Sequence, residues 1–153
     1  MDLEKAKEAA KRVRLVVLDV DGVLTDGSIW TGEAGEAVKR FYARDGLGIK
    51  MLQAAGIPVA ILTGRVSAQT AARAAELGIC SVAQGKQFKT RAFESILAEH
   101  GCSASECAYM GDDVPDIPVL DMAGLSTAPA DADPAIAAMV DWVAPKNGGS
   151  GAV

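Results

Sequence analysis

The chain has 153 residues, of which half are hydrophobic and 23% are charged. This composition is typical of one compact domain with a single core. Its 20 acidic and 15 basic side chains give a net charge of −5, so it offers no electrostatic footprint for nucleic acid or an anionic membrane. No apolar run approaches the roughly 20 residues that span a bilayer, and the charged residues 1–14 read as a helix, not a signal peptide. We therefore expect a cytoplasmic protein.

Cysteine and histidine chemistry is also disfavoured. The three cysteines lack metal-ligand spacing and are expected to be idle thiols in a reducing compartment. His100 is the only histidine and reads as the end of a helix before the capping residue Gly101. The sequence therefore argues against a histidine-dependent catalytic triad.

Short β-prone runs alternate with longer helical ones along the chain. Strands are expected at residues 14–20, 57–63, 79–83, 107–111, 124–128 and 141–144, and helices at about 45–55, 67–77, 88–100, 116–123 and 133–139. Strands that are apolar on both faces and separated by helices indicate a parallel sheet covered on both sides. We predict a single α/β domain over residues 1–153, with a doubly wound, Rossmann-like sheet.

Residues 26–44 break this alternation. Glycines among β-prone residues predict a β-hairpin that projects after the first strand. Trp30, Phe41 and Tyr42 concentrate aromatic side chains there, which favours a lid or a subunit interface over a hairpin folded back on its own core. The Gly-rich residues 146–153 are expected to form a mobile tail.

Polar side chains follow four of the expected strands, at the ends where ligands bind in open α/β sheets. Asp19 and Asp21 follow the first strand, Thr63 and Gly64 the second, and Asp112 and Asp113 the fourth, with Asp116 one helical turn further on; two lysines follow the third strand. All of these positions converge on one edge of the sheet, whereas ordinary surface residues would be scattered.

The acidic residues indicate a divalent cation. The i, i+2 spacing of Asp19 and Asp21 places both side chains on one side of extended backbone. Two close carboxylates stay ionised together only beside a cation. A cluster of carboxylate oxygens without histidine or thiolate favours Mg²⁺. Thr63 and Gly64 can donate to a phosphoryl oxygen, and a lysine can neutralise it. Phosphoryl transfer fits these groups best.

The motifs DVDGVLT, LTGR, a lysine and GDDVPD resemble, in this order, the four signature motifs of the haloacid dehalogenase superfamily of phosphohydrolases. The stretches DVDGVLTDGSIW, FYARDGLGIKML, AGLSTAPADADP and NGGSGAV extend the likeness over nearly the whole chain, to its 3-deoxy-D-manno-octulosonate 8-phosphate phosphatase group. This resemblance implies a fold without a large cap domain and a homotetramer in which the hairpin packs against neighbouring subunits. It also implies hydrolysis of a phosphorylated sugar acid in lipopolysaccharide biosynthesis.

The resemblance also implies a role for each motif residue. Asp19 would be the nucleophile that forms an aspartyl-phosphate, and Asp21 the general acid and base. Mg²⁺ would be held by Asp19, the backbone carbonyl of Asp21, and Asp112. Asp113 and Asp116 would support these ligands from further out.

Thr63 and Gly64 would bind the phosphoryl oxygens. The family's QGxxxK pattern selects Lys89 as the phosphate-binding lysine, with Lys86 as the alternative. Arg44 with Asp45, and Arg65, are candidates for recognising the acidic sugar, some of them across a subunit boundary. For Arg65, an ion pair at a helix entry is an equally weighted alternative.

The chain departs from the family pattern at its end, where Ser150 stands in GGSGAV in place of the arginine of GGRGAVRE. A nine-carbon, sialic-acid-like ulosonate 9-phosphate or a broader range of sugar phosphates is therefore an alternative substrate. Two other classes of function compete with a phosphatase. One is a receiver-type signalling domain, and the other is a non-catalytic relative that kept the fold.

Overall fold

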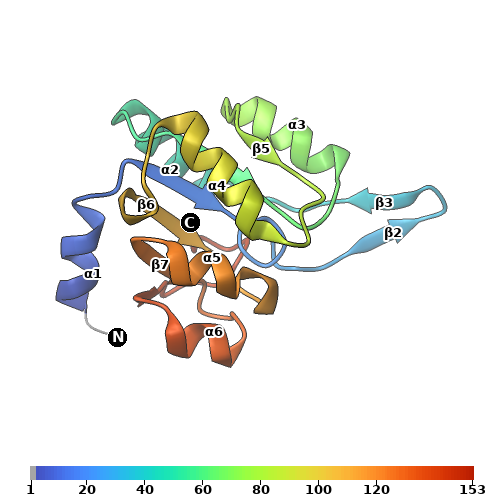
Figure 1. Ribbon diagram of the computed structural model, residues 1–153. Helices are drawn as coiled ribbons and strands as arrows, with labels where there is room; N and C mark the ends of the chain where they lie inside the picture. The colour runs from blue at the N-terminus through green and yellow to red at the C-terminus, as the bar shows by residue number, and fades with distance from the viewer. Residues whose placement is uncertain (1–2) are drawn as a thin grey trace.

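The computed structural model describes residues 3–153 and has two sheets with helices between the strands (Figure 1). The described helices are α1 (Leu3–Ala10), α2 (Ala43–Ala54), α3 (Ala68–Leu77), α4 (Lys89–His100), α5 (Ile117–Met122) and α6 (Pro134–Met139), with short 3-10 turns at Ala104–Glu106 and Val114–Asp116. The strands are β1 (Leu15–Leu18), β2 (Trp30–Gly32), β3 (Gly35–Val38), β4 (Val59–Leu62), β5 (Val82–Ala83), β6 (Cys107–Met110), β7 (Leu125–Ala128) and β8 (Trp142–Val143).

Six parallel strands form the main sheet in the order β5-β4-β1-β6-β7-β8. Numbered within this sheet alone, the order is 3-2-1-4-5-6, which is that of the doubly wound Rossmann type. The predicted fold class is confirmed. The order differs from the 2-1-3-4-5 order of flavodoxin-like domains such as receivers, so it also argues against a receiver domain.

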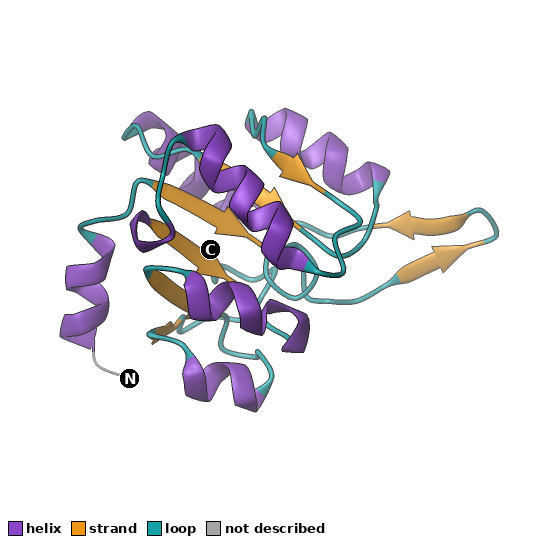
Figure 2. Ribbon diagram, viewed as in Figure 1, coloured by secondary structure: helices purple, strands orange, loops and turns teal. Residues whose placement is uncertain are grey.

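The sheet is apolar on both faces because alternate residues of its strands point to opposite sides. Leu15 and Val17 of β1 pack in one buried cluster with residues of α4, α5 and α6. Leu18 packs in a second cluster with residues of α2 and α3. Figure 2 shows the helices on the two sides of the sheet. Within residues 3–153, none of the helices has the length and apolarity needed to cross a membrane.

Strands β2 and β3 form the predicted hairpin, which projects beyond the sheet (Figure 1). All three residues of β2 are exposed, and Trp30 is 62% exposed. The alternative of a hairpin folded back on its own core is therefore wrong. The predicted hairpin range is also too long, since Ala43 and Arg44 already belong to α2.

Residues 148–153 are packed, which differs from the mobile tail expected over residues 146–153, although Lys146 and Asn147 are exposed. Gly148, Gly149 and Ala152 are buried, and Ala152 belongs to the same buried cluster as Leu18. The Gly149 amide donates to the Val23 carbonyl oxygen at 3.0 Å. The small glycines that suggested mobility are what allow this segment to lie close against another backbone.

Candidate active site

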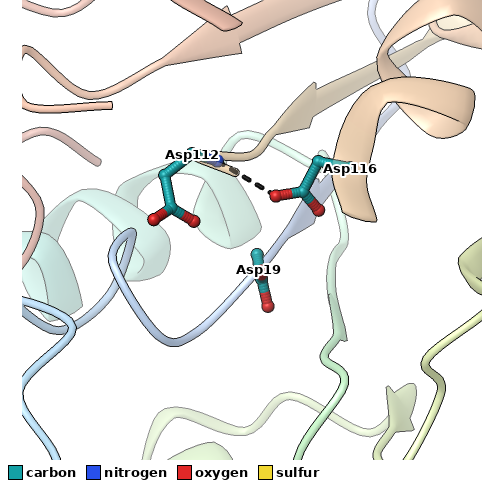
Figure 3. A group of neighbouring side chains, drawn as sticks. All are labelled: Asp19, Asp112 and Asp116. Atoms are coloured by element: carbon teal, nitrogen blue, oxygen red, sulfur yellow. Dashed lines mark hydrogen bonds between the residues drawn. The ribbon is translucent and has the colours of Figure 1, made fainter. Parts of the chain in front are cut away.

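The predicted site residues meet where the strand order reverses, between β1 and β6. Asp19 directly follows β1, Thr63 directly follows β4, and Asp112 lies two residues beyond β6. Parallel strands bring these carboxyl ends to one edge of the sheet, at the switch point where α/β proteins bind ligands. Figure 3 shows Asp19, Asp112 and Asp116 as neighbouring side chains, with the Asp112 amide donating to the Asp116 carboxylate. Three of their carboxylate oxygens, one from each residue, lie within 4.8 Å of one another.

A buried lysine organises this cluster. Lys89, the first residue of α4, is only 3% exposed. Its Nζ donates to Asp19 Oδ2 at 2.7 Å, to Asp116 Oδ1 at 2.6 Å, and to the Tyr109 hydroxyl at 3.3 Å. Burial alone would lower the pKa of Lys89, but the two carboxylates outweigh it and raise that pKa above 10.5. Lys89 is therefore a fixed positive charge, held against the Asp19 carboxylate.

Asp116 is the support for this lysine. It is fully buried, and its Oδ1 also accepts the Tyr109 hydroxyl at 2.5 Å. Its Oδ2 accepts the backbone amides of Asp112 at 3.0 Å and Asp113 at 3.3 Å. Both oxygens thus already have two donors each, which suits a residue that orients its neighbours. Gly111 permits the close packing, since a Cβ there would lie 2.5 Å from Asp116 Cγ.

Asp112 and Asp19 have the properties of cation ligands. The buried Oδ1 of Asp112 has no hydrogen-bond partner among the described residues. Burial, followed by the charges of Asp19, Asp116 and Asp113, raises the pKa of Asp112 to about 7. Burial also raises the pKa of Asp19 to about 6, against the opposing effect of Lys89. A divalent cation would satisfy the unpartnered oxygen and stabilise both ionised carboxylates, so these residues fit Mg²⁺.

Asp21 lies at a more open position, with its side chain 21% exposed. Its Oδ1 accepts a hydrogen bond from Lys39 Nζ, and its Oδ2 lies 3.7 Å from Arg65 Nε. Lys39 comes from the base of the hairpin, and its side chain is only 2% exposed. Sequence reasoning missed Lys39, because a single lysine in a mixed polar and apolar hairpin carries no pattern of its own. The burial of its charge beside Asp21 marks it as part of the site.

A cavity of about 220 Å³ connects these groups. It is lined by Asp19, Asp21, Thr63, Gly64, Arg65, Lys89, Asp112, Asp113, Pro115 and Asp116. Thr63 is 2% exposed, and a Cβ added to Gly64 would meet no atom within 4 Å. The structure thus brings nine of the ten predicted site residues around one cavity.

Three other candidate positions lie outside this cavity. Arg44 is exposed on α2 and is not among the described residues that line this cavity. Lys86, the alternative to Lys89, instead lines a separate depression along β5 and α4. Asp45, expected near the sugar, is 2% exposed and accepts the Gly151 amide at 3.3 Å. Asp45 therefore anchors the C-terminal segment of its own chain, because its position in the first turn of α2 directs it inward.

Asp113 is exposed and acts locally. Its Oδ1 accepts the Val114 amide at 2.7 Å, and Asp113 forms a reciprocal capping box with Asp116 around the turn Val114–Asp116. This box fixes the direction in which Asp112 and Asp116 enter the site.

Comparisons with known proteins agree with this geometry. The sequence model of the haloacid dehalogenase-like hydrolases matches residues 43–124, more than half of the chain. The chain is also 44% identical over 144 residues to the 3-deoxy-D-manno-octulosonate 8-phosphate phosphatase of Salmonella typhi, covering 94% of this chain and 77% of that protein. The chain therefore belongs to the haloacid dehalogenase-like hydrolase family.

Solved structures show which members of the family this chain is similar to. The 3-deoxy-D-manno-octulosonate 8-phosphate phosphatase of Yersinia pestis superposes with a TM-score of 0.95 at 42% identity, over 97% of this chain and 80% of that one. The phosphatase of the same name from Moraxella catarrhalis, solved with a magnesium ion, a phosphate ion and the sugar acid, has a TM-score of 0.95 at 39% identity, over 99% of this chain and 87% of that one. These relatives are the sugar-acid phosphatases that the sequence motifs resemble.

Proposed function

We propose that the protein is a Mg²⁺-dependent phosphomonoesterase that hydrolyses 3-deoxy-D-manno-octulosonate 8-phosphate to the free sugar acid and phosphate. One observation carries this proposal. The buried Asp19 carboxylate is held by Lys89 beside the unpartnered Asp112 Oδ1, while the more exposed Asp21 faces the same cavity. This arrangement provides a nucleophile, a cation site and a separate acid and base, and the relatives named above act on this sugar phosphate.

Asp19, Asp112 and the backbone carbonyl of Asp21 would hold Mg²⁺. The bound cation would neutralise charge on the phosphoryl group and on the carboxylates around it. Asp116 is left out of this set because four donors already occupy its oxygens. It supports the ligands instead, together with Asp113.

Asp19 and Asp21 divide the chemistry. An Asp19 carboxylate oxygen attacks phosphorus, and the bond between phosphorus and the sugar oxygen breaks. Asp21 gives its proton to that departing oxygen. It then takes a proton from the water that attacks the aspartyl-phosphate, which releases phosphate and restores Asp19. Asp21 is suited to both steps because it is nearer to solvent than the buried Asp19.

Thr63, Gly64 and Lys89 bind the phosphoryl oxygens, and Arg65 binds the sugar acid at the cavity mouth. The Arg65 side chain is 44% exposed and close to Asp21, so its charge can reach a carboxylate outside the cavity. The cavity of about 220 Å³ suits the phosphoryl end of the substrate. Most of the sugar then lies at the mouth, where specificity is decided.

We further propose a cytoplasmic homotetramer assembled through the hairpin. Ile29, Trp30 and Val38 are 52%, 62% and 58% exposed and together place apolar surface on β2, β3 and the preceding loop. Exposed apolar surface of this kind supports a subunit interface. Such an interface would also allow Arg44, which lies outside the cavity of its own chain, to serve a neighbouring site. Sedimentation of the wild-type protein and of Trp30→Ser tests this assembly. We expect the mass of a tetramer for the wild type and a smaller mass for the variant, and the same mass for the two proteins would contradict the proposal.

Phosphate release from a panel of substrates tests the function. The panel contains the eight-carbon ulosonate 8-phosphate, a nine-carbon ulosonate 9-phosphate and common sugar phosphates, each with and without Mg²⁺. We expect Mg²⁺-dependent turnover with the highest kcat/KM for the eight-carbon substrate. Asp19→Asn should abolish turnover with the fold intact, whereas Asp121→Asn, on the exposed side of α5, should not.

Other outcomes of the panel would redirect the proposal. A preference for the nine-carbon substrate would change the assigned sugar, and equal rates for all would contradict a dedicated ulosonate phosphatase. Binding without turnover would indicate a non-catalytic relative.

A further inference from the structure

The C-terminal segment touches the loop that follows Asp21. Gly148 and Gly149, here called the tail glycine pair, are buried against residues 22–25. The Gly149 amide donates to the Val23 carbonyl oxygen at 3.0 Å. A Cβ on Gly148 would lie 1.8 Å from the Gly22 carbonyl oxygen. Only glycine permits this approach of two backbones.

The same loop touches the proposed metal site. A Cβ on Gly22 would lie 1.9 Å from Asp112 Oδ2, so this backbone runs directly beside a proposed Mg²⁺ ligand. Gly22 has a φ of +87°, a conformation that suits glycine. Gly22 thus contacts Asp112 on one side and the tail glycine pair through its carbonyl oxygen. A displacement of Gly22 would reach the Asp112 carboxylate and the adjoining Asp21 carbonyl.

The tail glycine pair is held independently of this loop. The Gly148 amide donates to Asp131 Oδ1 at 2.9 Å. Further on, the Gly151 amide donates to the buried Asp45, and Ala152 is only 7% exposed. The tail is therefore a fixed surface against which the loop rests.

We propose that Gly148 and Gly149 are positioning residues that set the place of the Asp21–Gly22 backbone and, through it, the Mg²⁺ site. This inference rests on the proposed function, since it concerns the same metal site. The pair makes no contact with substrate. It acts by keeping the Gly22 peptide at a fixed distance from Asp112. The Asp21 backbone carbonyl and the Asp112 carboxylate, the two proposed Mg²⁺ ligands beside this peptide, then keep their relative positions. Any side chain at position 148 displaces that peptide.

Gly148→Ala tests the proposal, with Gly124→Ala as its matched control. A Cβ on Gly124 would lie 2.1 Å from the Ser105 carbonyl oxygen, so both variants force the same kind of collision between a Cβ and a carbonyl. Gly124 directly precedes β7, at the opposite edge of the sheet from the site. Mg²⁺ affinity by isothermal titration calorimetry, Tm, kcat and KM would be measured for both.

Both variants should have a lower Tm than the wild type. Only Gly148→Ala should weaken Mg²⁺ binding, by about tenfold or more. Gly148→Ala should also lower kcat by a larger factor than it raises KM. Equal Mg²⁺ affinity and kcat in the two variants would overturn the proposal. The calorimetry does not depend on turnover, so it decides the positioning role even if the wild-type protein hydrolyses none of the sugar phosphates.

Asp131→Ala provides a second test should Gly148→Ala fail to fold. Asp131 is exposed, and its removal frees the Gly148 amide without a collision. We expect Mg²⁺ affinity to fall by about threefold, in the same direction as for Gly148→Ala. Asp121→Ala, at another exposed aspartate, should leave it unchanged. Unchanged affinity in both aspartate variants would contradict a fixed tail as the support for the loop.

Discussion

Replacing Asp116 by asparagine tests the buried network around Lys89 with almost no change of shape. The carboxylate accepts from Lys89, Tyr109 and two backbone amides. An amide has only one oxygen, so its NH₂ group must face two of these donors whichever way it is turned. Turned toward the two backbone amides, the NH₂ group meets two donors that cannot accept. Turned toward Tyr109 and Lys89, it meets a hydroxyl that can rotate to accept and an ammonium that cannot, so this orientation costs less.

The expected loss of stability follows from that count. Losing one charge-assisted hydrogen bond to a buried ammonium costs about 1.5–3 kcal/mol, and removing one partner of a buried ion pair costs about 3–5 kcal/mol. Lys89 keeps Asp19 as a partner, and the substitution relieves repulsion toward Asp112. We therefore expect the lower end of the second range, about 3 kcal/mol, which lowers Tm by about 6–12 °C in a chain of this size.

The assay combines thermal unfolding with phosphate release at saturating Mg²⁺. Because Lys89 then moves relative to Asp19, kcat should fall on the order of a hundredfold. Asp121→Asn should change the free energy of unfolding by less than about 0.5 kcal/mol, as exposed substitutions generally do. If Asp116→Asn unfolds at the wild-type Tm and keeps its kcat, the buried network does not hold Lys89 in place.

Three further predictions concern the metal site and Asp21. The pKa values of Asp19 and Asp112 are about 6 and about 7, against 3.8 unperturbed. The metal-free folded protein therefore binds protons more strongly than the unfolded chain does. Its free energy of unfolding should fall as the pH rises from about 4 to about 7. Mg²⁺ must displace these protons, so its affinity by calorimetry should rise by up to about tenfold per pH unit for each carboxyl and level off above about pH 7. Lys39→Met removes the buried partner of Asp21 and should lower kcat about tenfold with little change in KM. Gly22→Ala directs a Cβ into Asp112 and should abolish Mg²⁺ binding in the same calorimetric assay.

Matched controls separate these effects from general damage. Lys50→Met removes an exposed lysine from α2, and a kcat loss equal to that of Lys39→Met would contradict a role for the Asp21 pair. Gly56→Ala imposes a similar backbone strain at a φ of +82° but meets no atom within 4 Å. Equal Mg²⁺ affinity in the two alanine variants would contradict the close contact at Gly22. Affinity that stays constant from pH 5 to pH 7 would contradict the raised carboxyl pKa values.

The sequence predicted most of the site because the polar residues directly follow buried strands. The parallel sheet then brings Asp19, Thr63 and Asp112 to one edge without further information. The choice between the two lysines came from the resemblance to the family's QGxxxK pattern, which pointed to Lys89. Lys89 lines the cavity and Lys86 does not.

The missed features depend on contacts between distant segments. Lys39 reaches Asp21 because of where the hairpin base lies, and no periodicity marks that position. Asp116 was assigned a support role, but its complete burial with four donors follows from tertiary packing at Gly111. The glycines of the tail predicted mobility because composition shows only backbone freedom. The structure uses the same glycines for close contact with the Gly22 loop.

Trapping the phosphorylated aspartate tests the central claim most directly. The protein would be mixed with the eight-carbon ulosonate 8-phosphate and Mg²⁺, quenched within one turnover and treated with borohydride, which reduces an aspartyl-phosphate to homoserine. Peptide mass spectrometry then locates the modified residue. We predict homoserine at position 19 alone, and none in Asp19→Asn. Homoserine at another aspartate, or its absence despite rapid phosphate release, would contradict Asp19 as the nucleophile.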